Sequence, residues 1–362
     1  MNSINRNDAS DELPVVYAAT YDHLGIILWG RKELERILDQ EIARLKKFPD
    51  FKVGWDHEAF VYDYLAGNSP EVLNKLKETL RKFKGRLGIG SCTYGQPLSA
   101  FINEESNIRH LTMALKTTEK HFNYHQSIYL TSEHAFHTQL PQLLTGCGFR
   151  GVILRTHFMM YGHNPEFDAP VGWWKGMDGS RIPAVPTYVG QTEPPLLRHK
   201  IPGATSTLDN RILTDAISDR CKLTLEDFRR KFGNRIRPLV ATRADDPRSE
   251  ESLIACHAGD NAYKWVTLED IFELLPRPRV EFDIQTNDFK PRMPWGYCGS
   301  RMLINARKCE AIVLAAERLA AIGHSLGFSD FETKIEAAWK NLLIAQHHDI
   351  QIKGYRIPDY GV

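Results

Sequence analysis

The sequence predicts an α/β fold followed by a helical bundle, and two observations support this prediction. Between residues 14 and 155, short apolar runs typical of buried strands alternate with amphipathic segments typical of helices. This alternation predicts a parallel sheet with helices on both faces. From residue 299 to 344 the pattern contains helices only, so we place a domain boundary near residues 286–298.

Five short apolar runs in the first half of the sequence are predicted strands. Each is bounded by polar or turn residues, as expected for a strand that is buried in a parallel sheet. They span residues 14–20, 51–55, 86–92, 127–131 and 151–155.

Predicted helices separate these strands. Apolar residues recur at helical spacing between 34 and 45, which gives an amphipathic helix. Ser69-Pro70-Glu71 supplies an N-cap, a proline at the first helical position and an acid in the first turn of a helix that ends near Gly85. Two more helices are predicted at 103–122, with Asn103 as the cap, and at 141–145.

Residues 157–236 are less regular. They contain Trp173-Trp174, the turn signal Asp178-Gly179 and a proline-rich stretch from Pro183 to Pro202. An insertion of this length in an α/β unit more often shapes a substrate site than packs a core. The alternative is a surface insertion without a role in the site.

Regular patterning returns after this insertion. We predict strands at 238–242 and 265–266, and helices at 253–257, 268–275, 303–322 and 331–344. The predicted organisation is a tail at 1–13, an α/β domain at 14–288, the start of a helical bundle at 289–352 and a tail without a convincing element at 353–362.

Composition excludes several classes of partner. The chain has 362 residues, of which 42% are hydrophobic, and its formal net charge is +1, so nothing favours nucleic acid or an anionic membrane. No apolar run is long enough for a membrane span, and the polar residues 1–13 lack the apolar core of a signal peptide, which predicts a cytoplasmic protein. The six cysteines are scattered without a CxxC pair, so neither a disulfide framework nor a zinc knot is expected.

Polar side chains follow six of the predicted strands. Because parallel sheets bind ligands at the carboxyl ends of their strands, these residues predict a pocket for a polyhydroxylated or charged small molecule. Any one of them alone is also explained as a polar residue where a strand reaches solvent. The residues are Asp22 and His23; Asp56 and Glu58; Thr93, Tyr94 and Gln96; Glu133, His134 and His137; Arg155 and His157; and Asp245 and Asp246.

Aromatic side chains in the insertion offer flat apolar faces for sugar rings. Trp173, Trp174 and Tyr161 are the candidates. Core packing is the alternative, and we expect it for at least one of the two tryptophans.

The segment Gln346-His347-His348-Asp349 follows an apolar helical run at 342–345. Its imidazoles and carboxylate are suited to a metal ion or to substrate hydroxyl groups. The alternative is a helix cap, since histidines interact favourably with the negative end of a helix dipole.

Three segments resemble glycoside hydrolase family 38, the retaining α-mannosidases. Glu133-His134-Ala135-Phe136-His137, with the Gly148-Phe149 pair, is similar to the family's acid-x-Phe-Gly-His-Ser stretch. Gln346-His347-His348-Asp349 is similar to the family's Gln-His-His-Asp metal motif. Trp295-Gly296-Tyr297, Ser300-Arg301 and the 315–319 run resemble the start of its helical bundle, so the resemblance extends from about residue 14 to 354.

The resemblance implies a distorted seven-stranded parallel α/β barrel followed by a helical bundle and then large β domains, which this sequence does not include. It implies zinc as the cofactor, a glycoside as the ligand, His348 as a zinc ligand and Asp349 as a contact for substrate hydroxyls. This sequence departs from the family pattern at three positions. Ala19 and His23 occupy the first-strand ligand positions, and Gln96 occupies the position of the nucleophilic aspartate.

A retaining glycosidase needs two carboxyl groups roughly 5–5.5 Å apart. The catalytic candidates are Asp245, Asp246 and Glu133, with Asp22 as a further carboxylate. His348 and His23, or Asp22 in place of His23, are the candidate metal ligands. The predicted substrate-binding residues are Asp349, Asp22, Tyr94, Gln96, His137, Arg155 and Trp173.

Two functions are consistent with these residues. The first is a divergent family 38 glycoside hydrolase, similar to α-mannosidases. The second is a carbohydrate-binding pseudoenzyme that has lost the zinc and nucleophile positions.

Overall fold

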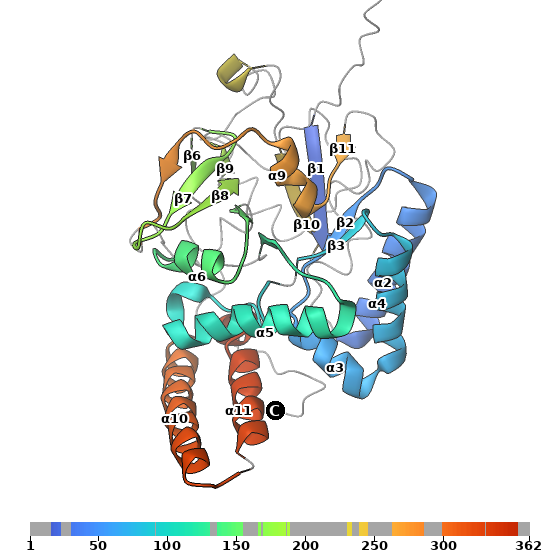
Figure 1. Ribbon diagram of the computed structural model, residues 1–362. Helices are drawn as coiled ribbons and strands as arrows, with labels where there is room; N and C mark the ends of the chain where they lie inside the picture. The colour runs from blue at the N-terminus through green and yellow to red at the C-terminus, as the bar shows by residue number, and fades with distance from the viewer. Residues whose placement is uncertain are drawn as a thin grey trace, which may run out of the picture.

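The structure is a computed structural model of the 362-residue chain. It describes residues 16–22, 30–90, 92–130, 136–154, 166–167, 169–185, 187–188, 230–233, 239–244, 263–285, 299–329 and 331–353. Two five-stranded sheets lie above a long helix, and a helical hairpin projects from the far side of that helix (Figure 1).

The first sheet contains the N-terminal strands. Its order is β10 (Leu239–Ala244), β1 (Val16–Asp22), β2 (Val53–Trp55) and β3 (Leu87–Ile89), and β11 (Tyr263–Trp265) pairs with the first residues of β1. Its strand pairs are all parallel. The carboxyl ends of β1, β2 and β10 are in register, because Asp22 pairs with both Trp55 and Ala244.

The second sheet has the order β12 (Glu281–Phe282), β7 (Gly172–Lys175), β8 (Arg181–Val185), β5 (Gly151–Ile153) and β4 (Ile128–Tyr129). Strands β7 and β8 form an antiparallel hairpin, while the other pairs are parallel. Its turn contains Gly179 at a φ of 85°, a conformation that favours glycine. A short parallel ribbon, β6 (Glu166–Phe167) with β9 (Thr187–Tyr188), completes the described strands.

The expected α/β class is confirmed, but a closed seven-stranded parallel barrel is not seen in the described ranges. The described strands lie in two separate five-stranded sheets and a two-stranded ribbon, and no pairing joins β3 to β4. The physical reason is local. Part of the irregular 157–236 stretch folds as the antiparallel β7–β8 hairpin, whose tight turn at Asp178-Gly179 returns the chain beside itself.

Helices cover the first sheet as the apolar spacing predicted. Helix α2 (Arg31–Lys47) buries Leu34, Leu38 and Leu45, and α4 (Pro70–Lys82) begins at the predicted proline. Between them lies α3 (Phe60–Asn68), which the sequence did not predict. Its Phe60, Val61, Tyr62 and Leu65 are all buried, so the segment lacks the one-sided apolar pattern that reveals a helix.

The long helix α5 (Glu104–Phe122) lies beneath both sheets (Figure 1). It follows the predicted Asn103, although that side chain makes no capping bond to the helix. The second sheet is completed by α6 (Leu140–Gly146) and by α9 (Leu268–Leu274), which Thr267 and Asp270 cap reciprocally.

The C-terminal helices are α10 (Gly299–Ser325), α11 (Glu332–Ala345) and α12 (His348–Lys353). The hairpin of α10 and α11 projects downward from α5 in Figure 1. The predicted helix at 303–322 is thus present, and its apolar residues Ile312, Leu319 and Ile322 are exposed by 67%, 68% and 57%. Helix α12 was not predicted, and it places Lys353 in a helix rather than in a tail. Among the described helices, none combines the length and apolarity that crossing a bilayer requires.

The loop after β3 presses directly on α11. A Cβ atom added to Gly95 would lie 2.4 Å from the carbonyl oxygen of Leu343, which is backbone and cannot move aside cheaply. This close approach fixes the distance between the loop and the end of α11, where the candidate site begins.

Gly95→Ala is therefore expected to lower the free energy of unfolding by about 1–3 kcal/mol or more, because it overpacks a buried backbone contact. Gly146→Ala is the control, since a Cβ atom there meets nothing within 4 Å. Chemical denaturation of both variants measures the effect. An equal and small change in the two variants would contradict the proposed close contact.

Candidate functional site

The segment Gln346-His347-His348-Asp349 lies at the junction of α11 and α12 and is buried. The exposed fractions are 1% for Gln346 and His347, 0% for His348 and 8% for Asp349. Gln346 ends α11, and His348 begins α12. The segment therefore turns the chain inside the protein, against the loops that follow β2 and β3.

The backbone carbonyl of Gln96 orients His348. It accepts hydrogen bonds from the His348 amide at 3.1 Å and from the His348 Nδ1 at 2.8 Å. Because Nδ1 carries the donated proton, Nε2 is the nitrogen that would bind a metal ion. The Nε2 atom lies 3.5 Å from Oδ2 of Asp349.

Both ring nitrogens of His347 are engaged within the protein. Nε2 lies 2.7 Å from Oε1 of Glu58, and Nδ1 accepts the amide of Asp349 at 3.0 Å. The accepted amide proton makes Nε2 the protonated nitrogen, so Nε2 donates to the buried Glu58 carboxylate. The His347 ring also stacks on that of His348, with centroids 4.1 Å apart. His347 thus supports its neighbours rather than facing a ligand.

Gln96 has an unusual backbone conformation, and within the described residues its side-chain amide is bound through the nitrogen only. Its φ of 44° lies in the left-handed region, which is uncommon for a residue with a side chain. Its Nε2 donates to the Asp56 carbonyl at 2.8 Å and to Asp56 Oδ1 at 3.2 Å. Its Oε1 is buried and, in the part of the chain that the structure describes, has no hydrogen-bond partner. A buried acceptor of this kind suits a hydroxyl group of a ligand.

Asp56 and Glu58 were named among the polar residues at strand ends that predict a pocket, but the sequence assigned neither of them a particular role. Both follow β2, and they are 0% and 1% exposed. Their position directly after a predicted strand was the available signal, but it did not distinguish them from ordinary polar residues at a strand end. Their bonds to Gln96 and His347 place them beside the Gln-His-His-Asp segment.

The other predicted residues are placed in different ways. Eight of them lie outside the described residues, and for Asp22 the structure describes only its strand position at the end of β1, in register with the end of β2. Their predicted roles stay predictions. The eight are His23, Glu133, His134, Arg155, His157, Tyr161, Asp245 and Asp246.

Tyr94 is buried, and its hydroxyl group donates to Oδ2 of Asp63 on α3 at 3.2 Å. This hydrogen bond directs the ring toward α3, and a ligand contact by Tyr94 stays a prediction. Trp174 is 0% exposed and belongs to the core of the second sheet, whereas its neighbour Trp173 in β7 is half-buried. Core packing of one tryptophan of the pair is thus confirmed.

His137 is half-buried, and burial lowers its pKa to about 4. Its Nε2 has no hydrogen-bond partner within the described ranges. A neutral imidazole of this kind can accept or donate one bond to a ligand.

The zinc implied by the resemblance fits the described residues only in part. His347, His348 and Asp349 place one ligand atom each within 4.8 Å of one another. Since His347 is engaged on both nitrogens, His348 and Asp349 remain as donors. Zinc sites take three or four protein ligands, so a complete site requires at least one more. Asp22 and His23 are the sequence-based candidates for it.

Solved structures with a similar fold are carbohydrate-active enzymes. The chain is similar to a glycosyl hydrolase family 38 protein from Enterococcus faecalis, with 16% identity and a TM-score of 0.55 over 93% of this chain and 36% of that one. It is also similar to an alpha-mannosidase from Enterococcus faecalis V583, with 15% identity and a TM-score of 0.58 over 92% and 38% of the two chains. The alpha-amylase AmyC from Thermotoga maritima shares 12% identity and a TM-score of 0.54, over 92% of this chain and 87% of that one.

These likenesses show that the chain has a fold similar to that of these three proteins. The chain spans little more than a third of the two Enterococcus faecalis proteins. No curated protein matches the sequence. The family described as "Glycosyl hydrolases family 38 N-terminal domain" matches residues 15–230, which is more than half of the chain. The protein therefore belongs to glycosyl hydrolase family 38, as the sequence motifs predicted.

Gln96→Glu is expected to destabilise the protein at neutral pH. The new carboxylate would face the carbonyl and carboxylate oxygens of Asp56, which now accept hydrogen bonds from the amide. Two buried acceptors without a proton between them lower the free energy of unfolding by about 1–3 kcal/mol. Their repulsion also raises the pKa of the new glutamate in the folded state. The deficit in unfolding free energy is therefore expected to be smaller at pH 5 than at pH 7.5. Chemical denaturation at both pH values measures it, and a deficit that grows at pH 5 would refute this hydrogen-bond assignment.

Acid is expected to destabilise the protein through its buried histidines. Burial lowers the pKa of His57 to about 4, despite the nearby Glu58, and has the same effect on His137. Between pH 6.5 and 4 the unfolded chain therefore binds more protons than the folded one, so stability falls as the pH falls through this window. Each such histidine contributes at most about 1.4 kcal/mol per pH unit. Denaturation across this range, compared with His57→Phe, tests the effect. The variant keeps an aromatic ring against Trp55, and its slope with pH should be shallower.

Proposed function

We propose that the protein is a glycoside hydrolase related to the α-mannosidases, which binds its sugar at the carboxyl ends of β1, β2 and β10. The observation that carries this proposal is the buried Gln-His-His-Asp segment, held against the loops after β2 and β3 in a chain of glycosyl hydrolase family 38. The enzyme of similar fold from Enterococcus faecalis V583 is described as an alpha-mannosidase, which supports the choice of sugar.

The described groups near the segment are mainly hydrogen-bond acceptors. Asp349 offers a carboxylate, Gln96 offers its Oε1 and His348 offers Nε2. A sugar hydroxyl group donates one hydrogen bond and accepts others, so a polyol suits these acceptors better than an anion does. Asp349, with a side chain 11% exposed, is the most accessible of the three.

A metal ion, if bound, would be held by His348 and Asp349 together with a further ligand. Zinc would supply a Lewis acid for the substrate hydroxyl groups there. The roles of the protein groups do not depend on it. The Gln96 carbonyl sets the orientation of the His348 ring, and Glu58 sets that of His347.

Hydrolysis with retention requires a nucleophilic carboxylate and a carboxylic acid. Gln96 carries a neutral amide and cannot form the glycosyl ester, although it stands at the nucleophile position of the family. We assign the two roles to carboxyl groups among Asp245, Asp246, Glu133 and Asp22. Strand register supports Asp22 and Asp245, because Asp22 pairs with Ala244, the residue before Asp245.

The second candidate function is carbohydrate binding without hydrolysis. One specific observation favours it. The Gln96 amide is locked by two hydrogen bonds to Asp56, so the position that normally supplies the nucleophile has become part of a stable polar core.

The proposed function predicts turnover of an aryl α-mannoside and its loss in His348→Ala. The substitution removes the imidazole that lies beside Asp349, and with it the hydrogen bond that the ring Nδ1 donates to the Gln96 carbonyl. Hydrolysis rates, binding of methyl α-mannoside by calorimetry and metal content by elemental analysis are measured together. His324→Ala is the matched control, since His324 is exposed at the far end of α10.

Binding without turnover would support the pseudoenzyme, provided that the far-ultraviolet circular dichroism shows folded protein. Neither binding nor turnover with folded protein would contradict both functions. Turnover that survives in His348→Ala would contradict the assigned place of the site.

A further inference from the structure

A chain of buried hydrogen bonds runs from α10 to the loop that carries Gln96. The Gly95 amide donates to Nδ1 of His110 at 3.1 Å, and Nε2 of His110 lies 3.1 Å from Oε1 of Gln346. Nε2 of Gln346 then donates to Oγ of Ser106 at 2.9 Å. The amide of Ser106 donates to Oε1 of Glu310 at 3.2 Å. These bonds join α5, the end of α11, α10 and the site loop.

Only one arrangement of protons satisfies this chain. The Gly95 amide can only donate, so Nδ1 of His110 must accept and Nε2 must carry the proton. That proton fixes the Gln346 amide with its oxygen toward His110 and its nitrogen toward Ser106. The Ser106 hydroxyl group accepts the bond from Gln346, and the Ser106 backbone amide donates to the Glu310 carboxylate. Every donor therefore points in one direction, from the loop to α10.

Burial makes this chain costly to break. His110 and Gln346 are 1% exposed, and Ser106 and Glu310 are 0% exposed. Burial lowers the pKa of His110 to about 3, so its ring is neutral at ordinary pH. Water cannot replace a lost partner at such positions, and hydrogen bonds that run in series strengthen one another.

The hydrogen-bond chain ends at the loop that contains Gly95 and Gln96, where the backbone is strained. Gly95 precedes Gln96, whose φ of 44° is unfavourable for a residue with a side chain and whose carbonyl orients His348. A strained conformation persists only where its surroundings hold it. The bond from Gly95 to His110 holds the loop on one side, and the contact with Leu343 holds it on the other.

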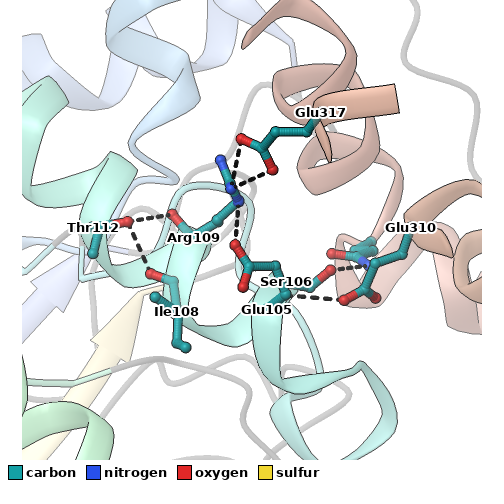
Figure 2. A network of polar contacts seen from close by, with 8 residues as sticks. Glu105, Ser106, Ile108, Arg109, Thr112, Glu310 and Glu317 are labelled. Atoms are coloured by element: carbon teal, nitrogen blue, oxygen red, sulfur yellow. Dashed lines mark hydrogen bonds and ion pairs between the residues drawn. The ribbon is translucent and has the colours of Figure 1, made fainter. Parts of the chain in front are cut away.

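The other end of the chain lies in the interface between α5 and α10. Figure 2 shows Ser106 beside Glu310, and Arg109 of the same helix beside Glu105 and Glu317. Arg109 donates to both oxygens of Glu317 at 2.9 and 2.8 Å, and its guanidinium lies 4.1 Å from the Trp339 ring centroid. Glu317 thus joins the same two helices as Glu310 but takes no part in the chain to the loop.

We propose that His110 is a positioning residue for the carbohydrate site, and that Glu310 of α10 anchors it through Ser106 and Gln346. The chain holds the Gly95-Gln96 peptide in the conformation that orients His348. The packing of α10 on α5 thereby affects ligand binding at a site that Glu310 does not touch. The choice of a sugar as the ligand rests on the proposed function. The claim that His110 and Glu310 hold the Gly95-Gln96 loop does not.

The experiment uses the whole 362-residue chain. It compares amide hydrogen exchange in residues 93–98 with the binding of methyl α-mannoside. His110→Leu and Glu310→Leu each remove one link while keeping a side chain of similar size. Both are expected to speed exchange of the loop amides at least tenfold and to weaken binding at least tenfold. His110→Asn keeps an acceptor near Nδ1 and should restore much of the loop protection. Glu310→Gln keeps an acceptor for Ser106 and should do the same at the far end.

Glu317→Leu is the matched control, because it breaks a bond between the same helices outside the chain. It should leave exchange in 93–98 unchanged. Unchanged loop exchange in both His110→Leu and Glu310→Leu would overturn the proposal. An equal effect of Glu317→Leu would overturn it as well, since the effect would then be general loosening. If the unchanged protein does not bind methyl α-mannoside, the proposed function fails, while the exchange rates still decide the positioning role.

Discussion

The carbonyl group of Gln96 is the point on which the candidate site depends. It accepts two hydrogen bonds from one residue, the amide and the ring Nδ1 of His348. Because both donors belong to His348, this single acceptor fixes the start of α12 and the direction of the imidazole together. Around it, Asp56 holds the Gln96 side chain, Glu58 holds His347 and His110 holds the preceding glycine. A strained residue is thus surrounded by bonds that leave it no alternative conformation.

The elements that the sequence predicted well are those whose burial is one-sided or complete over a short run. Helices α2, α4 and α5 and strands β1 to β5 lie where the apolar spacing indicated. Helix α3 was missed because it is buried on several sides, and the β7–β8 hairpin was missed because its Trp173-Trp174 and proline content resembled irregular structure. The closed barrel came from family resemblance, and local pattern carries no information on how distant strand edges pair.

The candidate site was predicted in part. The Gln-His-His-Asp segment is buried where β2 and β3 end, and its role as a pocket motif stays a prediction. His110 was not named, and Asp56 and Glu58 were named only as polar residues at a strand end, because the roles of all three arise from partners as many as 289 positions away. The family resemblance implied that an amide, Gln96, stands at the position of the nucleophile. The bonding of that amide to Asp56 became visible only in the structure.

The hairpin of α10 and α11 has a further consequence for local stability. At its base, Ala306, Trp339 and Leu342 are buried together, whereas Leu319, Ile322 and Leu326 are exposed along its outer part. Segments with few buried contacts open at a lower free energy than the core. The distal turns should therefore fray as an independent unit and be the preferred point for a protease to cut, while Glu310 near the base stays docked on α5. The hairpin is consequently divided into a docked base that supports the site and an outer part that can open without disturbing it.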